Sequence, residues 1–221
     1  MPTQLTRRDF LQAALGAAAA LGATAAVGSS AGCASSRPAE KKTIATPSSS
    51  YRPGAAAEQR ILVGYATATG STVDVANAIG AALGARGFAV DVKPLTEQPA
   101  LAGYRAAVLG SAIHGGKWLP EAAAYVEQNR VALAAMPVAL FCVHAMNCGP
   151  DPEATKRRQA YLDPQRALVK PIAEGYFVGI GPTGAESNWL TLSAFKAFGG
   201  CVEGDGRDFD AIRTWAQQLA L

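Results

Sequence analysis

The hexapeptide Thr67-Ala68-Thr69-Gly70-Ser71-Thr72 combines residue types that can hold a phosphate group. Four hydroxyl side chains surround Gly70, a residue that lets the backbone close around a small ligand. An apolar run precedes the hexapeptide and a segment of helical period follows it, which places it at the start of a helix. Unpaired N–H groups and the helix dipole attract an anion there. The alternative is a Ser/Thr-rich turn that only caps the helix.

The kind of phosphate follows from what this loop contains. It has no lysine, whereas the phosphate loop for nucleoside triphosphates needs a lysine and a metal-binding hydroxyl at other spacings. The loop also lacks the glycine spacing of the Gly-x-Gly-x-x-Gly fingerprint of dinucleotide sites. The loop therefore predicts one terminal monophosphate held by neutral donors.

The elements that must position this loop alternate along the chain. Short apolar runs predict strands, and stretches with one apolar stripe predict helices. The strands are expected at residues 60–65, 88–93, 106–110, 137–143 and 175–180, and the helices at 72–85, 120–133 and 208–221. This alternation predicts an α/β doubly wound sandwich with a parallel sheet, in which the ligand lies beyond the carboxyl ends of the strands.

The loop resembles a known family. Thr67 to Thr72 matches the flavodoxin phosphate loop, Ser/Thr-x-Thr-Gly-x-Thr, at each specified position, and residues 60–221 resemble a flavodoxin-like domain throughout. Within that superfamily the chain is most similar to the menaquinone-dependent protoporphyrinogen oxidase group. The segments that carry this similarity are "AAVLGSAIHGGKWLPEAAAYV", "MPVALFCV", "SNWLTLSAFKAFGG" and "DFDAIRTWAQQL". The resemblance implies FMN as cofactor and a five-stranded parallel sheet of order 2-1-3-4-5 with helices on both faces.

The resemblance also implies a second set of cofactor-binding residues, which lie along the isoalloxazine ring. They are Ser111, Ala112, Ile113, His114, Gly115, Gly116, Lys117 and Trp118. Ser111 and Ala112 are expected to offer backbone groups, and Trp118 to stack on the ring unless it packs on the following helix. His114 and Lys117 are expected near the ring edge.

Two further regions are expected beside this site. His144 begins the loop after the fourth strand, either as a proton donor to substrate or as a hydrogen-bonded structural residue. His114 and His144 are thus the two candidate catalytic residues. In the long segment after the fifth strand, Asn188 and Trp189 are expected to shape the substrate or partner surface.

The first 32 residues resemble a twin-arginine export signal. Thr6-Arg7-Arg8-Asp9-Phe10-Leu11-Gln12 departs from the pattern Ser/Thr-Arg-Arg-x-Phe-Leu-Lys only at its last position, and an uncharged run follows. Cys33 stands where a lipoprotein signal would be cut, although simple cleavage is the alternative. Residues 33–59 are rich in Ser, Ala and Pro and predict a disordered tether. A periplasmic domain that leaves the cytoplasm already folded, with FMN loaded, is consistent with such a signal.

The other cysteines are Cys142, Cys148 and Cys201. Because the chain has only two histidines and no Cys-x-x-Cys pair, no metal site is expected. Cys148 and Cys201 are both expected in loops. Either they form a disulfide or they are buried or free thiols.

Charge limits the class of partner. The chain has 20 basic and 17 acidic residues and a formal charge of +3, which does not indicate a nucleic-acid surface. We therefore expect an exported FMN-dependent oxidoreductase that passes electrons between an unknown donor and a quinone or redox partner. The alternatives are a non-enzymatic electron carrier, usually strongly acidic on its docking face, and a flavin-free binding domain of the same fold.

Overall fold

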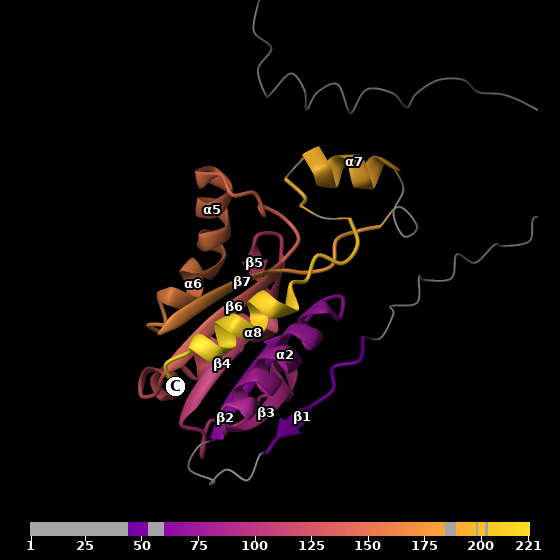
Figure 1. The fold of residues 1–221 in the computed structure, drawn as a ribbon. Coiled ribbons are helices and arrows are strands. Elements are labelled where there is room, and N and C mark those ends of the chain that lie inside the picture. Colours follow the sequence, from indigo (N-terminus) through magenta and orange to yellow (C-terminus); the bar gives the residue numbers. More distant parts are fainter. Residues whose placement is uncertain (1–43, 53–59, 184–188, 198, 202) are drawn as a thin grey trace, which may run out of the picture. The chain divides into compact units, whose positions relative to one another are not determined.

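A computed structural model of the chain describes residues 44–52, 60–183, 189–197, 199–201 and 203–221. The chain divides into the unit Met1–Lys41, which lies outside these residues, and the unit Lys42–Leu221. The predicted export signal and Cys33 therefore fall outside the described part. The second unit contains a seven-stranded sheet with helices on both faces (Figure 1).

The main sheet has the strand order β1-β3-β2-β4-β6-β7. Its strands are β1 (Ser49–Tyr51), β2 (Arg60–Ala66), β3 (Ala89–Pro94), β4 (Ala106–His114), β6 (Val138–His144) and β7 (Ala173–Val178). All neighbours from β3 to β7 are parallel, whereas β1 is antiparallel to β3. The predicted order 2-1-3-4-5 and the fold class are confirmed. Two strands are added to that prediction: β1 at the edge, and β5 (Lys117–Trp118), which pairs with β4.

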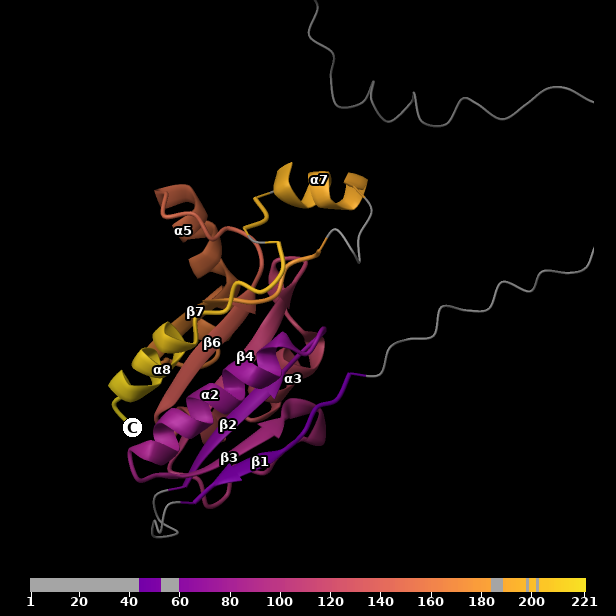
Figure 2. The same cartoon turned by 45° about the vertical axis from the view of Figure 1, so that its right-hand side comes forward.

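The helices divide the core into two layers. One apolar cluster lies between the sheet and the helices α2 (Ser71–Ala85) and α8 (Phe209–Gln218), which lie side by side in both views (Figures 1 and 2). The other lies under α3 (Pro120–Gln128), α4 (Arg130–Ala134) and η3 (Ala160–Leu162). Because both faces are covered, β6 is buried along its whole length.

Several helices differ from the sequence-based expectation. The helix expected over residues 120–133 is interrupted at Asn129, between α3 and α4. Three helices were not predicted individually: α5 (Pro152–Gln159), α6 (Asp163–Arg166) and α7 (Trp189–Ala197). α5 buries no residue and so has no apolar stripe to recognise. None of the helices in the described ranges is long and apolar enough to cross a membrane.

The prediction of a disordered tether over residues 33–59 is wrong for residues 49–51, because they form β1. Tyr51 packs against α2 where Gly80 and Gly84 leave room. A Cβ on Gly80 would stand 2.8 Å from Cε2 of Tyr51, and one on Gly84 would stand 2.9 Å from Cβ of Tyr51. The position of this edge strand depends on two glycines of α2, which is distant in the sequence. The local Ser/Pro-rich composition does not reveal that contact.

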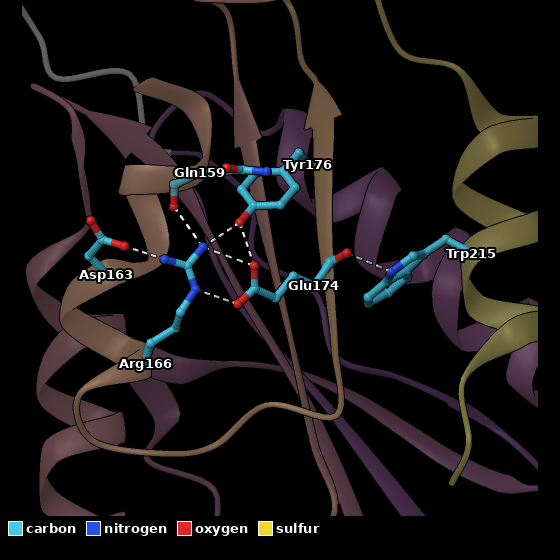
Figure 3. Close-up of polar contacts among 6 residues, drawn as sticks. All are labelled: Gln159, Asp163, Arg166, Glu174, Tyr176 and Trp215. Atoms are coloured by element: carbon cyan, nitrogen blue, oxygen red, sulfur yellow. Dashed lines mark hydrogen bonds and ion pairs between the residues drawn. The ribbon is translucent and has the colours of Figure 1, made fainter. Parts of the chain in front are cut away.

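The opposite edge of the sheet is held by a polar network around Arg166 (Figure 3). Its guanidinium donates to both carboxylate oxygens of Glu174 on β7, at 2.5 and 2.9 Å, and to the hydroxyl of Tyr176 at 2.8 Å. Trp215 of α8 donates from Nε1 to the carbonyl oxygen of Glu174 at 3.0 Å. β7 is thereby tied to α6 on one side and to α8 on the other.

Candidate functional site

The predicted phosphate loop joins β2 to α2 in the expected geometry. Gly70 is the N-cap of α2 with φ of 96°, a left-handed conformation that favours glycine. Its N–H donates to Oγ1 of Thr67 at 2.9 Å, so Thr67 shapes the loop from within. No side chain caps α2, which leaves its first N–H groups directed at the loop. Ala68 and Thr69 are exposed at the tip.

The hydroxyl of Thr72 tests whether these residues fit a phosphate. Thr72 is fully buried, and within the described residues its Oγ1 has no hydrogen-bond partner. A buried hydroxyl without a partner costs free energy unless a ligand supplies one. Ser71 is 5% exposed, and its Oγ would be 3.3 Å from a Cβ placed on Gly179 after β7. The loop is therefore a tight cradle with at least one unused donor, and it fits a phosphate.

The second predicted segment folds as a hairpin between β4 and β5. His114 pairs with Lys117, and the two residues between them, Gly115 and Gly116, have φ of 57° and 78°. Two consecutive left-handed residues are typical of a type I′ turn, which glycine favours. Residues 114–117 are exposed at the tip, where backbone groups and the side chains of His114 and Lys117 are accessible.

Ser111 and Ala112 lie below this tip, inside the sheet. Both are buried, and Ser111 pairs with Ala66 of β2 and Cys142 of β6. The Ser111 hydroxyl accepts from the N–H of Leu119 at 2.9 Å and fixes the entry to α3. The expectation that these two residues offer backbone groups to a flavin therefore stays a prediction. Ile113 and the hairpin tip are the accessible part of the segment.

Trp118 does not lie where the sequence analysis placed it. Its indole is 4% exposed and belongs to the core cluster under α3, together with Ala122 and Tyr125. The expected stacking on a flavin ring is wrong, and the alternative of packing against the following helix is confirmed. In the hairpin register Trp118 stands opposite Ile113.

A cavity of about 560 Å³ opens at the carboxyl ends of β4 and β6. Its walls come from the hairpin, the loop after β6, η3 and α7, and α7 lies beyond that end of the sheet in both views (Figures 1 and 2). The lining residues are Ile113, His114, Gly115, Gly116, His144, Ala145, Met146, Asn147, Tyr161 and Phe195. This volume is within the range of cofactor pockets.

Sequence reasoning missed Tyr161 and Phe195, the two aromatic residues of this wall. Tyr161 is 6% exposed, and its hydroxyl accepts from Nδ2 of Asn147 at 2.6 Å. Phe195 packs directly against Gly200, where an added Cβ would stand 2.3 Å from the ring. The only sequence signal for Phe195 was its place in the long segment after the fifth strand. Trp189 of the same helix is 73% exposed, and Asn188 lies outside the described residues.

His144 lies at the bottom of the cavity and is 3% exposed. Its Nδ1 is 2.8 Å from the carbonyl oxygen of Met146. A carbonyl only accepts, so Nδ1 carries the hydrogen and Nε2 is an acceptor. Nε2 is buried and has no partner among the described residues. Burial lowers the pKa of His144 to about 4, so the ring is neutral at pH 7. His144 is thus placed to accept a hydrogen bond, and the predicted role of proton donor is not supported.

Cys148 and Cys201 form a disulfide, with 5.4 Å between their Cα atoms. This confirms one of the two alternatives left open by the sequence. It joins the loop after β6 to the segment after α7, where Asn147 N–H also donates to the carbonyl oxygen of Gly199 at 2.9 Å. Ligand atoms of His144, Cys148 and Cys201 lie within 4.8 Å of one another, a grouping that the sequence analysis did not foresee. Because the sulfurs are bonded to each other, they are not thiolate ligands in this state.

Comparison with known proteins agrees with this geometry. The family model described as "Flavodoxin domain" matches residues 62–179, more than half of the chain. The chain belongs to the flavodoxin domain family. The match includes the phosphate loop, the hairpin and the loop after β6. FMN, the predicted cofactor, is the one that flavodoxin domains bind.

Several solved structures are similar to this flavodoxin domain at low sequence identity. A flavodoxin from the domain Archaea is 16% identical, with 73% of this chain and 96% of that chain covered and a TM-score of 0.45. Rubredoxin oxygen:oxidoreductase from Desulfovibrio gigas is also 16% identical, with a TM-score of 0.43. The match covers 72% of this chain and 34% of that one, so this chain spans about a third of that oxidoreductase.

A third similar structure is a Fusobacterium nucleatum flavodoxin mutant bound to flavin mononucleotide. It is 16% identical, with 38% of this chain and 51% of that chain covered and a TM-score of 0.34. No curated protein matches the sequence.

Proposed function

We propose that this flavodoxin domain is an FMN-dependent oxidoreductase that passes electrons between a donor and a quinone or a redox partner. The observation that carries the proposal is that two features occur together at the carboxyl ends of the parallel strands. One is an uncapped phosphate loop with an unused buried hydroxyl at Thr72, and the other is a cavity of about 560 Å³. When bound, FMN supplies one-electron or two-electron transfer.

The residues of this chain would divide the binding of FMN between them. Backbone N–H groups at the start of α2, with the hydroxyls of Ser71 and Thr72, would donate to the phosphate. The hairpin tip and Phe195 would flank the ring and exclude water. The unpartnered Nε2 of His144 would accept a hydrogen bond from a ring or substrate N–H. Exposed Lys117 at the hairpin would favour an anionic reduced ring.

Enzymatic turnover is proposed over simple electron carriage for two reasons. The chain lacks the acidic excess that carriers use for docking, since its formal charge is +3. Its hairpin segment also resembles that of the menaquinone-dependent protoporphyrinogen oxidase group, in which a quinone accepts the electrons. Steady-state reduction of a soluble menaquinone analogue by the FMN-loaded protein tests this choice. A carrier would exchange electrons with protein partners and give no quinone turnover.

We also propose export through the twin-arginine signal, with a lipid on Cys33. The position of Ile44 supports a role for such an anchor: its Cγ2 would be 3.7 Å from a Cβ placed on Gly70. The described chain thus enters the domain beside the phosphate loop, at the end of the sheet where the cofactor would bind. Ten residues lie between Cys33 and Ile44, and the eleven steps from Cα to Cα span at most about 40 Å. The anchor would keep the phosphate loop close to the membrane, at about that distance.

The proposed function has a direct biochemical test. Purified protein, extracted and run against standards, should release FMN, and the apoprotein should recover the visible flavin spectrum on reconstitution. Release of FAD, or no binding of either flavin, would refute the proposal.

Export is tested separately by fractionation. Replacing Arg7 and Arg8 with lysine should leave the precursor in the cytoplasm with FMN already bound, because this route carries folded proteins. Cys33→Ala should release the exported domain from the membrane fraction. Normal export of the double lysine variant would refute the signal, and membrane association after Cys33→Ala would refute the lipid anchor.

A further inference from the structure

We propose that the disulfide between Cys148 and Cys201 is a second two-electron redox centre, through which a dithiol donor reduces the bound flavin. The inference rests on the proposed function, because the flavin is the electron acceptor of the pair. It names the class of donor that the proposed function leaves open: a dithiol, carried by a small molecule or by a protein with paired cysteines.

The disulfide lies next to two residues of the cofactor cavity, His144 and Asn147. His144 lines the 560 Å³ cavity and also a second cavity of about 390 Å³, and Cys148 lines this second cavity as well. Both cysteines line a third cavity of about 400 Å³, which has Asp151, Glu153 and Arg157 at its walls. A reagent in the third cavity can therefore reach the sulfurs, and His144 borders both the cofactor cavity and the cavity beside Cys148.

Each sulfur has a nitrogen close to it. Nδ1 of His144 is 3.8 Å from Sγ of Cys148, and the backbone N–H of Cys148 donates to Sγ of Cys201 at 2.9 Å. Because Nδ1 carries the hydrogen, it can share that hydrogen between the carbonyl of Met146 and a thiolate at Cys148. N–H donors stabilise a thiolate over a thiol, so either sulfur can leave as a thiolate, and the one at Cys148 has the imidazole of His144 beside it.

The disulfide would be reduced by thiol–disulfide exchange. A thiolate of the donor attacks Sγ of Cys201, the bond between Cys201 and Cys148 breaks, and its electron pair leaves on Sγ of Cys148. The second thiol of the donor resolves the mixed disulfide, so the donor is oxidised to its own disulfide and both cysteines are reduced. With FMN bound, the reduced pair would supply two electrons and one proton to the oxidised flavin, the second proton would leave to solvent, and the bond between Cys148 and Cys201 would form again.

Cys142 provides an internal reference for this chemistry. It is a free cysteine in β6, fully buried, and burial raises the pKa of its thiol. It should therefore resist alkylation as long as the domain stays folded. Labelling of Cys148 and Cys201 without Cys142 reports opening of the disulfide in the native protein.

The first measurement uses the apoprotein and does not depend on FMN. The protein is equilibrated in dithiothreitol buffers of graded redox ratio, alkylated under native conditions and analysed by peptide mass. We expect Cys148 and Cys201 to become labelled together while Cys142 stays unlabelled. A pair that stays closed until Cys142 is also labelled would be purely structural, and the inference would be overturned.

The second measurement uses FMN-loaded wild-type protein without oxygen. Stepwise reduction should consume four electrons per FMN, two for the flavin and two for the disulfide. Dithiothreitol should bleach the flavin absorbance at least about tenfold faster than it bleaches free FMN. Consumption of only two electrons, or bleaching no faster than that of free FMN, would overturn the inference.

Cysteine variants distinguish electron transfer through the disulfide from the binding of FMN. Cys148→Ser and Cys201→Ser should abolish the fast bleaching by dithiothreitol and leave FMN affinity and reduction by dithionite unchanged, whereas Cys142→Ser should behave as wild type. Fast bleaching in the serine variants would refute the relay. If the protein binds no FMN, the proposed function fails, and labelling of the apoprotein still shows whether the pair is reducible.

Discussion

The hydroxyl of Ser50 donates to Oδ1 of Asp91 at 2.7 Å, and this contact joins the edge strand β1 to a carboxylate that is only 3% exposed. Arg52 and Arg60 form ion pairs with the same carboxylate at 2.8 and 2.7 Å, and the hydroxyl of Tyr104 donates to it at 2.9 Å. One buried charge therefore connects β1, β2, β3 and the segment before β4. The segment of residues 44–52, which contains β1, depends on this charge for its position.

Asp91→Asn should destabilise the domain by about 3–5 kcal/mol at pH 7, the usual cost of removing one partner of a buried ion pair. Burial by itself raises the pKa of Asp91, but hydrogen bonds from Ser50, Arg60 and Tyr104 outweigh it and lower the pKa to about 2. Because the folded pKa is below the unfolded value of about 4, the stabilisation is present above pH 4 and is lost as the pH falls toward 2. Urea unfolding at a series of pH values measures it.

Asp210→Asn is the matched control for this prediction. Asp210 also pairs with an arginine, Arg213, but its side chain is 92% exposed. Exposed pairs contribute little, so this variant should unfold within about 1 kcal/mol of wild type and keep the acid dependence. An Asp91→Asn variant with wild-type stability would show that the buried charge does not hold β1.

Thr72→Val tests the phosphate loop with a nearly isosteric change. The hydroxyl has no partner within the described residues, so its loss should leave the apoprotein at least as stable as wild type. Loss of a hydrogen bond to a charged phosphate, about 1.5–3 kcal/mol, should weaken FMN binding by about 10- to 150-fold. Titration of apoprotein with FMN measures the affinity, and thermal unfolding measures the stability.

Thr96→Val is the control, since Thr96 lies in the exposed turn η2 (Leu95–Glu97) outside the loop. Its FMN affinity should equal that of wild type. Unchanged affinity in Thr72→Val as well would mean that this hydroxyl does not contact the phosphate.

The parts of the fold that the sequence predicted are those set by local pattern. The loop at Thr67–Thr72 has its residue types in order between an apolar run and an amphipathic helix, and it folds as expected. The parallel strand order follows from the resemblance that this loop supports. By contrast, α5 makes its contacts through charged residues, and β1 depends on Gly80 and Gly84 of α2, thirty residues away. Such features depend on tertiary contacts that no local window contains.

The ring side of the site was harder to predict for a related reason. The sequence does not tell whether an aromatic residue near a ligand loop faces the ligand or the core. Trp118 faces the core. Its direction is set by the two-residue turn at Gly115 and Gly116, because the register places Trp118 opposite Ile113. Phe195 comes to the cavity from a helix some eighty residues later, held there by contacts after α7.

Phe195→Leu should therefore affect the flavin more than Trp118→Phe does. Phe195 lines the cavity, and loss of an aromatic contact of about 0.5–1.5 kcal/mol should weaken FMN binding by about 2- to 12-fold. Trp118→Phe removes a buried indole N–H that has no partner in the described ranges, and it should leave the flavin spectrum and affinity unchanged. Absorbance and affinity titrations of both variants decide the matter. The opposite ranking would return the stacking role to Trp118.

The network around Arg166 should couple the last strand, β7, to α6, the helix that directly follows η3. Glu174 receives two hydrogen bonds from Arg166, and their side chains are 24% and 31% exposed. Arg166 lowers the pKa of Glu174, so the stabilisation is present above the unfolded pKa of about 4.3 and declines below it.

A double-mutant cycle of Arg166→Met and Glu174→Gln measures this coupling. We expect a coupling energy of about 1–3 kcal/mol at pH 7 from urea unfolding, because the pair is bidentate and partly buried. The same cycle with Asp163→Asn in place of Glu174→Gln is the control. Asp163 also contacts Arg166, but its side chain is 64% exposed, so the coupling should stay below about 1 kcal/mol. Equal coupling in the two cycles would mean that the contact with β7 adds nothing beyond a surface pair, and that Trp215 and the core alone hold the strand in place.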